Sequence, residues 1–156
     1  MAFGWEPLQR LLDEGLDELA FEHWQEVGVD KDRIPYAPDY PAFIDMENRG
    51  AFKIMAARRA GRLVGYNGFI IARHLHYASC QAVNDVLYVA PDERWVGVSL
   101  IRQAEKLLFQ MQVDRIFYHA KLHVKIGSRE GTVGDLLTIL GYKHIENTYS
   151  KLREAA

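Results

Sequence analysis

The stretch from Asn84 to Gln110 carries the residue types and the spacing best suited to chemistry in this chain. An apolar segment, Val86–Ala90, ends at a proline, and Arg94, Gly97 and Ser99 follow as an amphipathic helix begins. The first N–H groups of a helix lack intrahelical acceptors, and the helix dipole adds partial positive charge there. Gly97 lets an anion approach the backbone closely, and Arg94 can add a charged hydrogen bond. The sequence therefore predicts a phosphate-binding turn between the strand and the helix.

The spacing does not fit the two common nucleotide-binding signatures. A Walker A loop ends in Gly-Lys-Ser or Gly-Lys-Thr, and a dinucleotide-binding fingerprint has three glycines. This chain instead has Arg-x-x-Gly-x-Ser, preceded by Leu-Tyr-Val-x-Pro. A Rossmann-type nucleotide-binding protein is also disfavoured, because the hairpins expected below imply a mostly antiparallel sheet.

The pattern resembles the central motif of the GNAT superfamily, the acetyl-CoA-dependent N-acetyltransferases. In that motif a strand and a proline precede Arg/Gln-x-x-Gly-x-Gly/Ala, and Ser99 departs from it. Two weaker similarities, Arg-Ala-Gly-Arg-Leu-Val-Gly-Tyr at 59–66 and Leu-Gly-Tyr at 140–142, extend the resemblance over residues 50–152. The resemblance implies an α/β (α+β) fold of the GNAT-like acyl-CoA N-acyltransferase type. Its central sheet would be mixed and mostly antiparallel, flanked by helices, with one splayed pair of strands.

The resemblance also implies acetyl-CoA as a co-substrate. Amides of the turn would hold the pyrophosphate, and the bulged strand before it would bind the pantetheine arm. A backbone amide near Val89 would polarise the acetyl carbonyl. The next segment, Arg115–Val124, would form the other wall as a strand. The expected cofactor-binding residues are Leu87, Tyr88 and Val89 on the strand, followed by Arg94, Trp95, Val96, Gly97, Val98 and Ser99.

Two residues are candidates for the general base of such a reaction. Asp85 lies four residues before Val89, where many GNAT proteins carry an acidic residue that removes a proton through water. Pairing of Asp85 with a neighbouring arginine, or a role at the strand start, is equally compatible with the sequence. His119 is the second candidate. His123 would share its strand face, but residues four apart on a strand are about 13 Å apart, so we expect no metal at this pair.

The candidate general acid is less well defined, because the chain departs from the resemblance here. Leu137 occupies the position of the tyrosine that protonates the leaving thiolate in many GNAT proteins, and Glu130 replaces an asparagine that contacts pantetheine. Tyr149, with Tyr142 and Tyr118 as alternatives, could supply the proton, or water could do so.

Two functional hypotheses follow from these residues. The first is an enzyme, an N-acetyltransferase in which a primary amine attacks acetyl-CoA directly. The second is a binding or structural module of the same fold with weak or no catalysis. The resemblance places the acceptor among aromatic side chains, those of Trp24, Tyr36, Tyr40, Phe43 and Tyr149, which could also simply pack under a proline-rich loop.

Charge suggests what kind of amine would bind. The first thirty residues hold eight acidic side chains against one arginine, although the whole chain has a net charge of only −2. These residues could attract a cationic amine or form a solvated helix face. The acidic side chains are Glu6, Asp13, Glu14, Asp17, Glu18, Glu22, Glu26 and Asp30.

The elements that must position these residues are read from periodicity and from Gly and Pro signals. We expect a helix over Pro7–Gly28 with a break at Gly15, and a proline-containing loop over 30–41. The further expected elements in the first part of the chain are a first strand near Phe3, a helix over Pro41–Asn48, a hairpin of Ala51–Ala57 and Leu63–Ile71, and a strand over His74–Val89 with a break near Ser79–Ala82. A helix over Gly97–Gln112 should follow, with a buried stripe of Ile101, Ala104, Leu108 and Met111. The last expected elements are a helix capped by Thr132 and Asp135 and ended by Gly141, and strands over Tyr142–Ile145 and Thr148–Leu152.

Length and composition set the remaining expectations. At 156 residues the chain is expected to form a single domain, residues 1–156. No apolar run approaches a membrane span, and the N-terminus lacks the pattern of a secretory signal. The single cysteine, Cys80, excludes an intramolecular disulfide and a zinc cage. We therefore expect a cytoplasmic protein that binds neither membrane nor nucleic acid, and a homodimer is left open.

Overall fold

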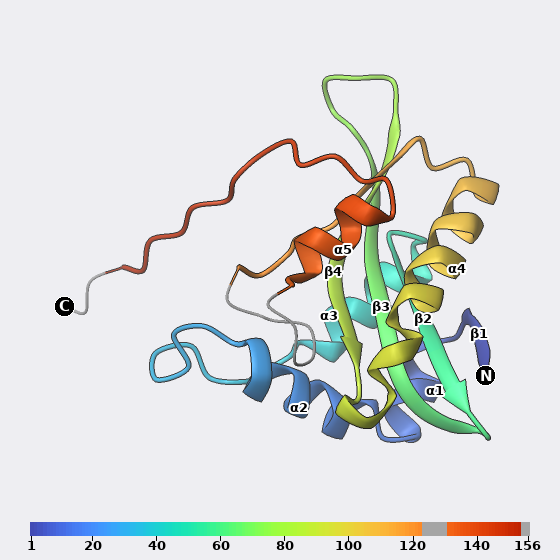
Figure 1. The fold of residues 1–156 in the computed structure, drawn as a ribbon, viewed down its shortest axis with the longest axis vertical. Helices are drawn as coiled ribbons and strands as arrows, with labels where there is room; N and C mark the ends of the chain where they lie inside the picture. The colour runs from blue at the N-terminus through green and yellow to red at the C-terminus, as the bar shows by residue number, and fades with distance from the viewer. Residues whose placement is uncertain (123–130, 154–156) are drawn as a thin grey trace. The chain divides into compact units, whose positions relative to one another are not determined.

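The computed structural model describes residues 1–122 and 131–153, which belong to two compact units, Met1–His119 and Ala120–Ala156. Among the described residues, the first unit holds a five-stranded sheet, four α-helices and the short 3₁₀-helix η1, and the second holds one α-helix (Figure 1). None of the described helices is long and apolar enough to cross a membrane. The expectation of a single domain stays a prediction.

The sheet runs in the order β1-β2-β3-β4-β5. Neighbouring strands are antiparallel except for β4 and β5, which are parallel, so the predicted mixed and mostly antiparallel sheet is confirmed. The first strand near Phe3 is also confirmed. The strands are β1 (Ala2–Trp5), β2 (Phe52–Arg59), β3 (Arg62–Arg73), β4 (Cys80–Val89) and β5 (Arg115–Phe117).

Two turns define the central strands. The β2–β3 hairpin turns at Ala60 and Gly61, both with positive φ (48° and 86°), as a two-residue hairpin turn with matched twist requires. The strand expected over His74–Val89 is wrong before Cys80, where β4 begins within the segment in which a break was expected, Ser79–Ala82. Arg73 pairs with Cys80, so the residues between them must reverse the chain instead of extending it.

One face of the sheet is covered by α1 (Leu8–Asp13), α2 (Leu16–Val27) and α3 (Tyr40–Asn48). The predicted break at Gly15 is confirmed, because its φ of 92° ends α1 and places α2 at a new angle. The side chain of Asp39 caps α3 by accepting a hydrogen bond from the N–H of Ala42 at 3.1 Å. The core on this face consists of Leu8, Leu11, Leu16, Phe52, Ile54, Ala56, Tyr66 and Tyr88.

The other face is covered by α4 (Gly97–Gln110), which begins where the 3₁₀-helix η1 (Pro91–Val96) ends (Figure 1). Its buried stripe is Leu100, Ile101, Ala104 and Leu108. Met111 was predicted to belong to this stripe but is 39% exposed, because the helix ends one residue before it.

The second unit contains α5 (Val133–Ile139). The predicted capping box is confirmed: the N–H of Asp135 donates to Oγ1 of Thr132 at 3.2 Å, and the N–H of Thr132 donates to the Asp135 carboxylate at 2.7 Å. Gly141 has a φ of 94° directly after the helix, as a C-terminal cap requires. The two strands predicted within 142–152 are wrong, since none of the described residues of that segment is in a strand. Few apolar residues alternate there, and an isolated hairpin is marginal.

Candidate functional site

The first component of the candidate site is the edge of β4 that faces β5. The two strands pair only from Gln81 to Val83, opposite Arg115 to Phe117. Among the described residues no strand pairs with the rest of that edge, so the predicted splayed strand pair is confirmed. The strand expected over Arg115–Val124 is correspondingly wrong after Phe117 up to residue 122, because its partner edge has turned away, and the last two of its residues lie outside the described residues.

The alternation of hydrogen bonds along β4 shows which of its backbone N–H and C=O groups face the opening between β4 and β5 beyond Val83. The N–H of Ala90 donates to the carbonyl of Val64 on β3 at 2.9 Å. In a regular antiparallel pair the hydrogen-bonded residues alternate, so Leu87 and Val89 point their N–H and C=O groups away from β3. These are the residues expected to hold the pantetheine arm. Within the described part of the chain, this edge of β4 is therefore unpaired, and an extended amide-containing ligand can pair with such an edge.

A β-bulge redirects the strand at Asp85. Gly68 of β3 pairs with Val86 and Phe69 pairs with Asn84, which leaves Asp85 as the extra residue. Such a bulge increases local twist and re-aims side chains. It explains why β4 parts from β5 at this point in the sheet.

A buried amide network holds the bulge in place. The side-chain amide of Asn84 donates to the carbonyl oxygens of Gly68 at 3.1 Å and Val86 at 2.9 Å, and to Oδ1 of Asn67 at 2.9 Å. The amide of Asn67 donates in turn to the hydroxyl of Tyr118 at 2.9 Å. Both asparagines are buried. The sequence reasoning missed this network, although two asparagines inside apolar strands were a signal for it.

The candidate base Asp85 lies at the bulge beside His119. Desolvation raises the pKa of Asp85, and the charge of His119 opposes that rise. A carboxylate with a raised pKa is a better proton acceptor than an ordinary surface aspartate. The structure therefore brings the two predicted base candidates together. His123 lies outside the described residues.

The predicted phosphate-binding turn differs from expectation in its backbone. Instead of an open loop, η1 runs directly into α4, and the N–H of Gly97 donates to the carbonyl of Arg94. Pro91 fixes a helical φ at the first position and no residue breaks the turn that follows, which accounts for the difference. The expectation that the Gly97 amide is unpaired is therefore wrong.

Gly97 nevertheless leaves room for a ligand at the start of α4. Its φ of −54° suits any residue, and an added Cβ would meet nothing closer than a methyl of Val89 at 4.0 Å. The fold itself does not require a glycine there. Close to it, Val96 is buried, whereas Ser99 and Trp95 are exposed. The missing side chain at Gly97 keeps open the approach to the start of α4, as a bound phosphate group would need.

Arg94 is directed toward α2. Its guanidinium forms an ion pair with the carboxylate of Glu26 and lies 5.9 Å from the ring centre of Tyr88. The hydrogen bond to Glu26 raises the pKa of Arg94, which is thus charged at any physiological pH. No described residue accepts a hydrogen bond from its buried Nε. Arg94 therefore has an incomplete set of partners in this arrangement.

A buried carboxylate beside Arg94 was also missed by the sequence reasoning. Glu93 is only 1% exposed, and its oxygens accept hydrogen bonds from Arg59 at 2.6 Å and from Nε1 of Trp95 at 3.1 Å. Arg62 lies 3.5 Å from the same carboxylate. Since a buried carboxylate needs such partners, Glu93 serves to fix η1 to the β2–β3 hairpin.

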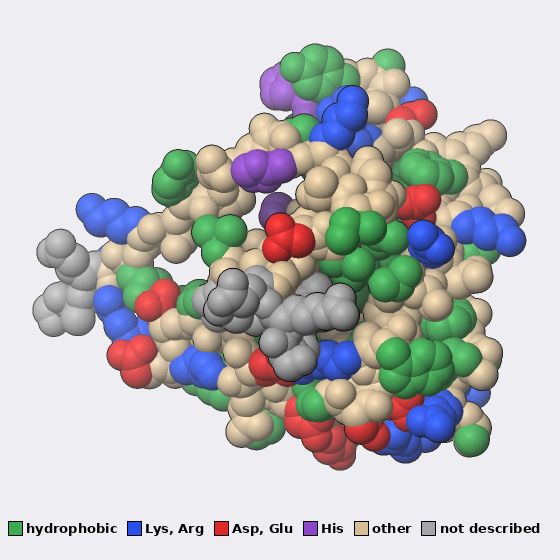
Figure 2. Space-filling view, viewed as in Figure 1, with side chains coloured by type: hydrophobic (Ala, Val, Ile, Leu, Met, Phe, Trp, Pro, Cys, Tyr) green, Lys and Arg blue, Asp and Glu red, His purple; other side chains and the backbone are tan. Residues whose placement is uncertain are grey.

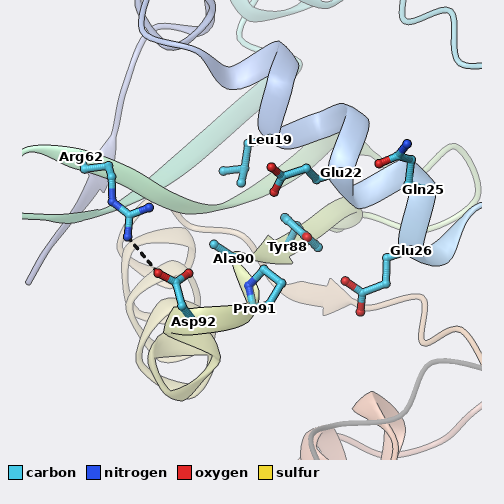
Figure 3. A pocket seen from close by; sticks show the side chains of 9 residues that line it. All are labelled: Leu19, Glu22, Gln25, Glu26, Arg62, Tyr88, Ala90, Pro91 and Asp92. Atoms are coloured by element: carbon cyan, nitrogen blue, oxygen red, sulfur yellow. Dashed lines mark hydrogen bonds and ion pairs between the residues drawn. The ribbon is translucent and has the colours of Figure 1, made fainter.

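A pocket of about 650 Å³ opens between α2 and the end of β4 (Figure 3). Three of its lining residues, Glu22, Glu26 and Asp92, are acidic, and Asp92 is paired with Arg62 at 3.2 Å. At the bottom of the view in Figure 2, acidic and basic side chains lie side by side. The lining residues are Leu19, Glu22, Gln25 and Glu26 of α2, Arg62 of β3, Tyr88, Ala90, and Pro91 and Asp92 of η1.

His23 fixes α2 beside this pocket. Its Nδ1 lies 2.8 Å from the hydroxyl of Tyr66, and its ring stacks on Tyr88 at 4.8 Å between ring centres. Burial raises the pKa of the Tyr66 hydroxyl, so that it stays protonated. The helix face that carries Glu22 and Glu26 is thereby held against β4.

The acidic N-terminal residues divide into two groups. Glu14 pairs with Arg10 and Arg58, and Asp17 accepts hydrogen bonds from Tyr36 at 2.8 Å and Tyr40 at 2.6 Å. These acids serve the packing of α1, α2 and the proline-containing loop. Glu22 and Glu26 are the two from this segment that line the pocket. The aromatic residues Tyr36 and Tyr40, predicted near the acceptor, thus have a structural role on Asp17.

The residues of the second unit complete the list of predicted positions. Tyr149, the candidate acid, is 89% exposed, and Leu137 is buried. Tyr118, an alternative candidate for the acid, belongs to the first unit. Its hydroxyl accepts a hydrogen bond from Asn67 in the amide network, and burial raises the pKa of that hydroxyl. Glu130 lies outside the described residues.

Comparisons with known proteins identify the fold. No protein-family model matches the sequence, and no curated protein does. Among solved structures, the chain is similar to a ribosomal-protein-alanine N-acetyltransferase from Brucella melitensis biovar Abortus 2308, with a TM-score of 0.69, 15% identity, and coverage of 99% of this chain and 100% of the other. A glucosamine-6-phosphate N-acetyltransferase from Arabidopsis thaliana gives a TM-score of 0.69 at 12% identity, with the same coverage.

An aminoglycoside acetyltransferase from an uncultured soil metagenomic sample gives a TM-score of 0.68 at 15% identity, covering 99% of this chain and 100% of the other. The chain therefore has the fold of the GNAT-type acetyltransferases, as the central motif predicted. At these identities the likeness concerns the fold, and the three proteins differ in the acceptors that their names give.

Proposed function

We propose that this chain is an N-acetyltransferase that moves the acetyl group of acetyl-CoA to a primary amine by direct attack. The observation that carries the proposal is the open edge of β4, where the backbone groups of Leu87 and Val89 face a gap that no described strand fills. Asp85 and His119 lie at the start of the same gap. A base and a free strand edge on β4, followed in the chain by an anion site at the start of α4, suit a long thioester ligand.

The chain's own residues would act as follows. The backbone of Leu87 and the C=O of Val89 would pair with the amides of the pantetheine arm, and the start of α4 with Arg94 would bind the phosphates. Asp85 would take a proton from the incoming ammonium through water, so that the neutral amine can attack the acetyl carbonyl carbon. The N–H of Val89 would stabilise the oxyanion of the tetrahedral intermediate. Its collapse would break the carbon–sulfur bond and release CoA thiolate. Tyr149 or water would protonate the thiolate, and the acylated nitrogen would return its surplus proton to that same group, which leaves a neutral amide and CoA thiol.

The acceptor is proposed to be a positively charged amine. Glu22 and Glu26 line the pocket beside β4, whereas Arg62 there is already paired with Asp92. Carboxylates at the wall of a pocket attract an ammonium group and can orient it. The supporting observation is thus the negative charge of the two glutamates at the pocket. Small polyamines and other basic amino groups would suit that charge.

Binding of acetyl-CoA is tested by isothermal calorimetry on the purified chain, with mass spectrometry of the native protein as a second readout. The proposal expects one molecule bound per chain. The acetyl transfer is then tested by following thiol release over a panel of amines. Absence of any acetyl-CoA binding would overturn the proposal.

A second candidate is a binding module of the same fold with weak or no catalysis. It is favoured by Leu137 in place of the usual tyrosine and by the Gly97 amide, which is already paired. The same two assays separate the candidates, because the module would bind CoA or an amine without thiol release above the uncatalysed rate.

A further inference from the structure

The ion pair between Arg94 and Glu26 joins the two halves of the proposed site. Arg94 lies three residues before Gly97 at the start of α4, and Glu26 is a wall residue of the acidic pocket. The side chains are 32% and 31% exposed, so both are accessible to a ligand. A residue of the anion site is therefore paired with a residue of the acceptor pocket.

The pair differs from the neighbouring one at Glu93. Glu93 is almost fully buried and has Arg59, Arg62 and Trp95 around it, as a permanent structural carboxylate would. Arg94 instead keeps a buried Nε that none of the described residues satisfies. An unsatisfied buried donor is costly, so Arg94 gains by moving to a ligand that offers more acceptor oxygens. Phosphate groups do so, since they bind the guanidinium fork bidentately.

We propose that Glu26 and Arg94 form an exchangeable ion pair that couples the two substrates. Phosphates of CoA take Arg94 from Glu26, and the released Glu26 carboxylate then receives the ammonium group of a cationic acceptor in the pocket. This inference rests on the proposed function.

Charge in the pocket changes with the exchange. While the pair is formed, Arg94 neutralises Glu26, and Glu22 remains as the other carboxylate of α2 in the lining. Once Arg94 moves away, both carboxylates face the pocket beside Tyr88. Each ligand then favours binding of the other, because linkage between two sites is reciprocal. The competing carboxylate also lowers the affinity for CoA as long as no amine is present.

The first test measures CoA binding by calorimetry in matched variants. Glu26→Gln removes the competitor and should tighten CoA binding roughly 2- to 5-fold, the size of a partly exposed ion pair. Glu22→Gln removes the same charge one helical turn away and should change CoA affinity less than about 2-fold. In an Arg94→Gln background, Glu26→Gln should have no further effect. Equal effects of the two glutamate variants, or an unchanged effect without Arg94, would overturn the inference.

The second test measures spermidine binding with and without saturating CoA. Wild-type protein should bind spermidine several-fold more tightly when CoA is present, and Glu26→Gln should lose that difference. No strengthening by CoA, including no spermidine binding at all, overturns the role of Glu26 toward the amine. Failure of the proposed function looks different, because CoA would then bind to none of the proteins.

Discussion

Asn84 offers a direct test of how the site is built, because its side-chain amide joins the bulge to β3. Asn84→Ala removes a donor that faces three oxygens, those of Gly68, Val86 and the Asn67 side chain. An amide has two N–H groups, so about two net hydrogen bonds of about 1 kcal/mol each are lost. Oxygens left buried without a donor add to this, for a total of about 2–4 kcal/mol in the free energy of unfolding.

Urea unfolding followed by circular dichroism measures this loss, with an unchanged m-value expected if the folded state keeps its compactness. Asn48→Ala is the control, because Asn48 is exposed at the end of α3 and should cost less than about 0.5 kcal/mol. An Asn84 variant as stable as this control would refute the role of the amide in holding the bulge.

Asn84→Asp sharpens the same test through pH. The new carboxylate would face three acceptor oxygens, so its pKa in the folded protein should lie above the unfolded value of about 3.9. The destabilisation should be complete above the folded pKa and should shrink as the pH falls through it, because the protonated acid can donate. A pH-independent difference from wild type would contradict this reasoning.

Three further predictions concern the proposed reaction. Gly97→Glu should abolish CoA binding by calorimetry while unfolding stays near wild type, because the backbone at Gly97 accepts any residue and the carboxylate repels phosphate; retained affinity would count against the anion site. Asp85→Asn should lower kcat on the order of 10²–10⁴-fold, with partial recovery at higher pH where more amine is neutral; wild-type turnover would transfer the role to His119. Glu22→Gln should raise KM for the amine and reduce its dependence on salt, whereas Asp13→Asn, outside the pocket, should not; equal behaviour of the two variants would make the acidic charge a general surface property.

Much of the fold was predictable because its signals are local. The break at Gly15, the hairpin turn at Ala60 and Gly61, and the capping box of Thr132 each depend on residues within a few positions of one another. The strand–proline–helix order around Gly97 is local as well. These features therefore follow from sequence patterns without knowledge of the tertiary structure.

The features that were missed depend on partners far away in the chain. Asn84 meets Asn67, 17 residues away, and Arg94 meets Glu26, 68 residues away, and no periodicity indicates such pairs. The helical backbone of η1 was missed because the residues between the strand and the helix were expected to form a phosphate-binding turn. The C-terminal strands were predicted from short alternating runs, which need a partner strand that the described residues do not provide.

If this chain transfers an acetyl group from acetyl-CoA to an amine, as we propose, free thiol and acetylated amine must form together. The most direct measurement is thiol release from acetyl-CoA by the purified protein with a panel of mono-, di- and polyamines, each product identified by mass spectrometry. We expect thiol release above the uncatalysed rate together with the acetylated amine, fastest for acceptors with more than one positive charge. Gly97→Glu should lose that rate. Thiol release that never exceeds the uncatalysed rate with any amine, despite bound acetyl-CoA, would contradict the proposal.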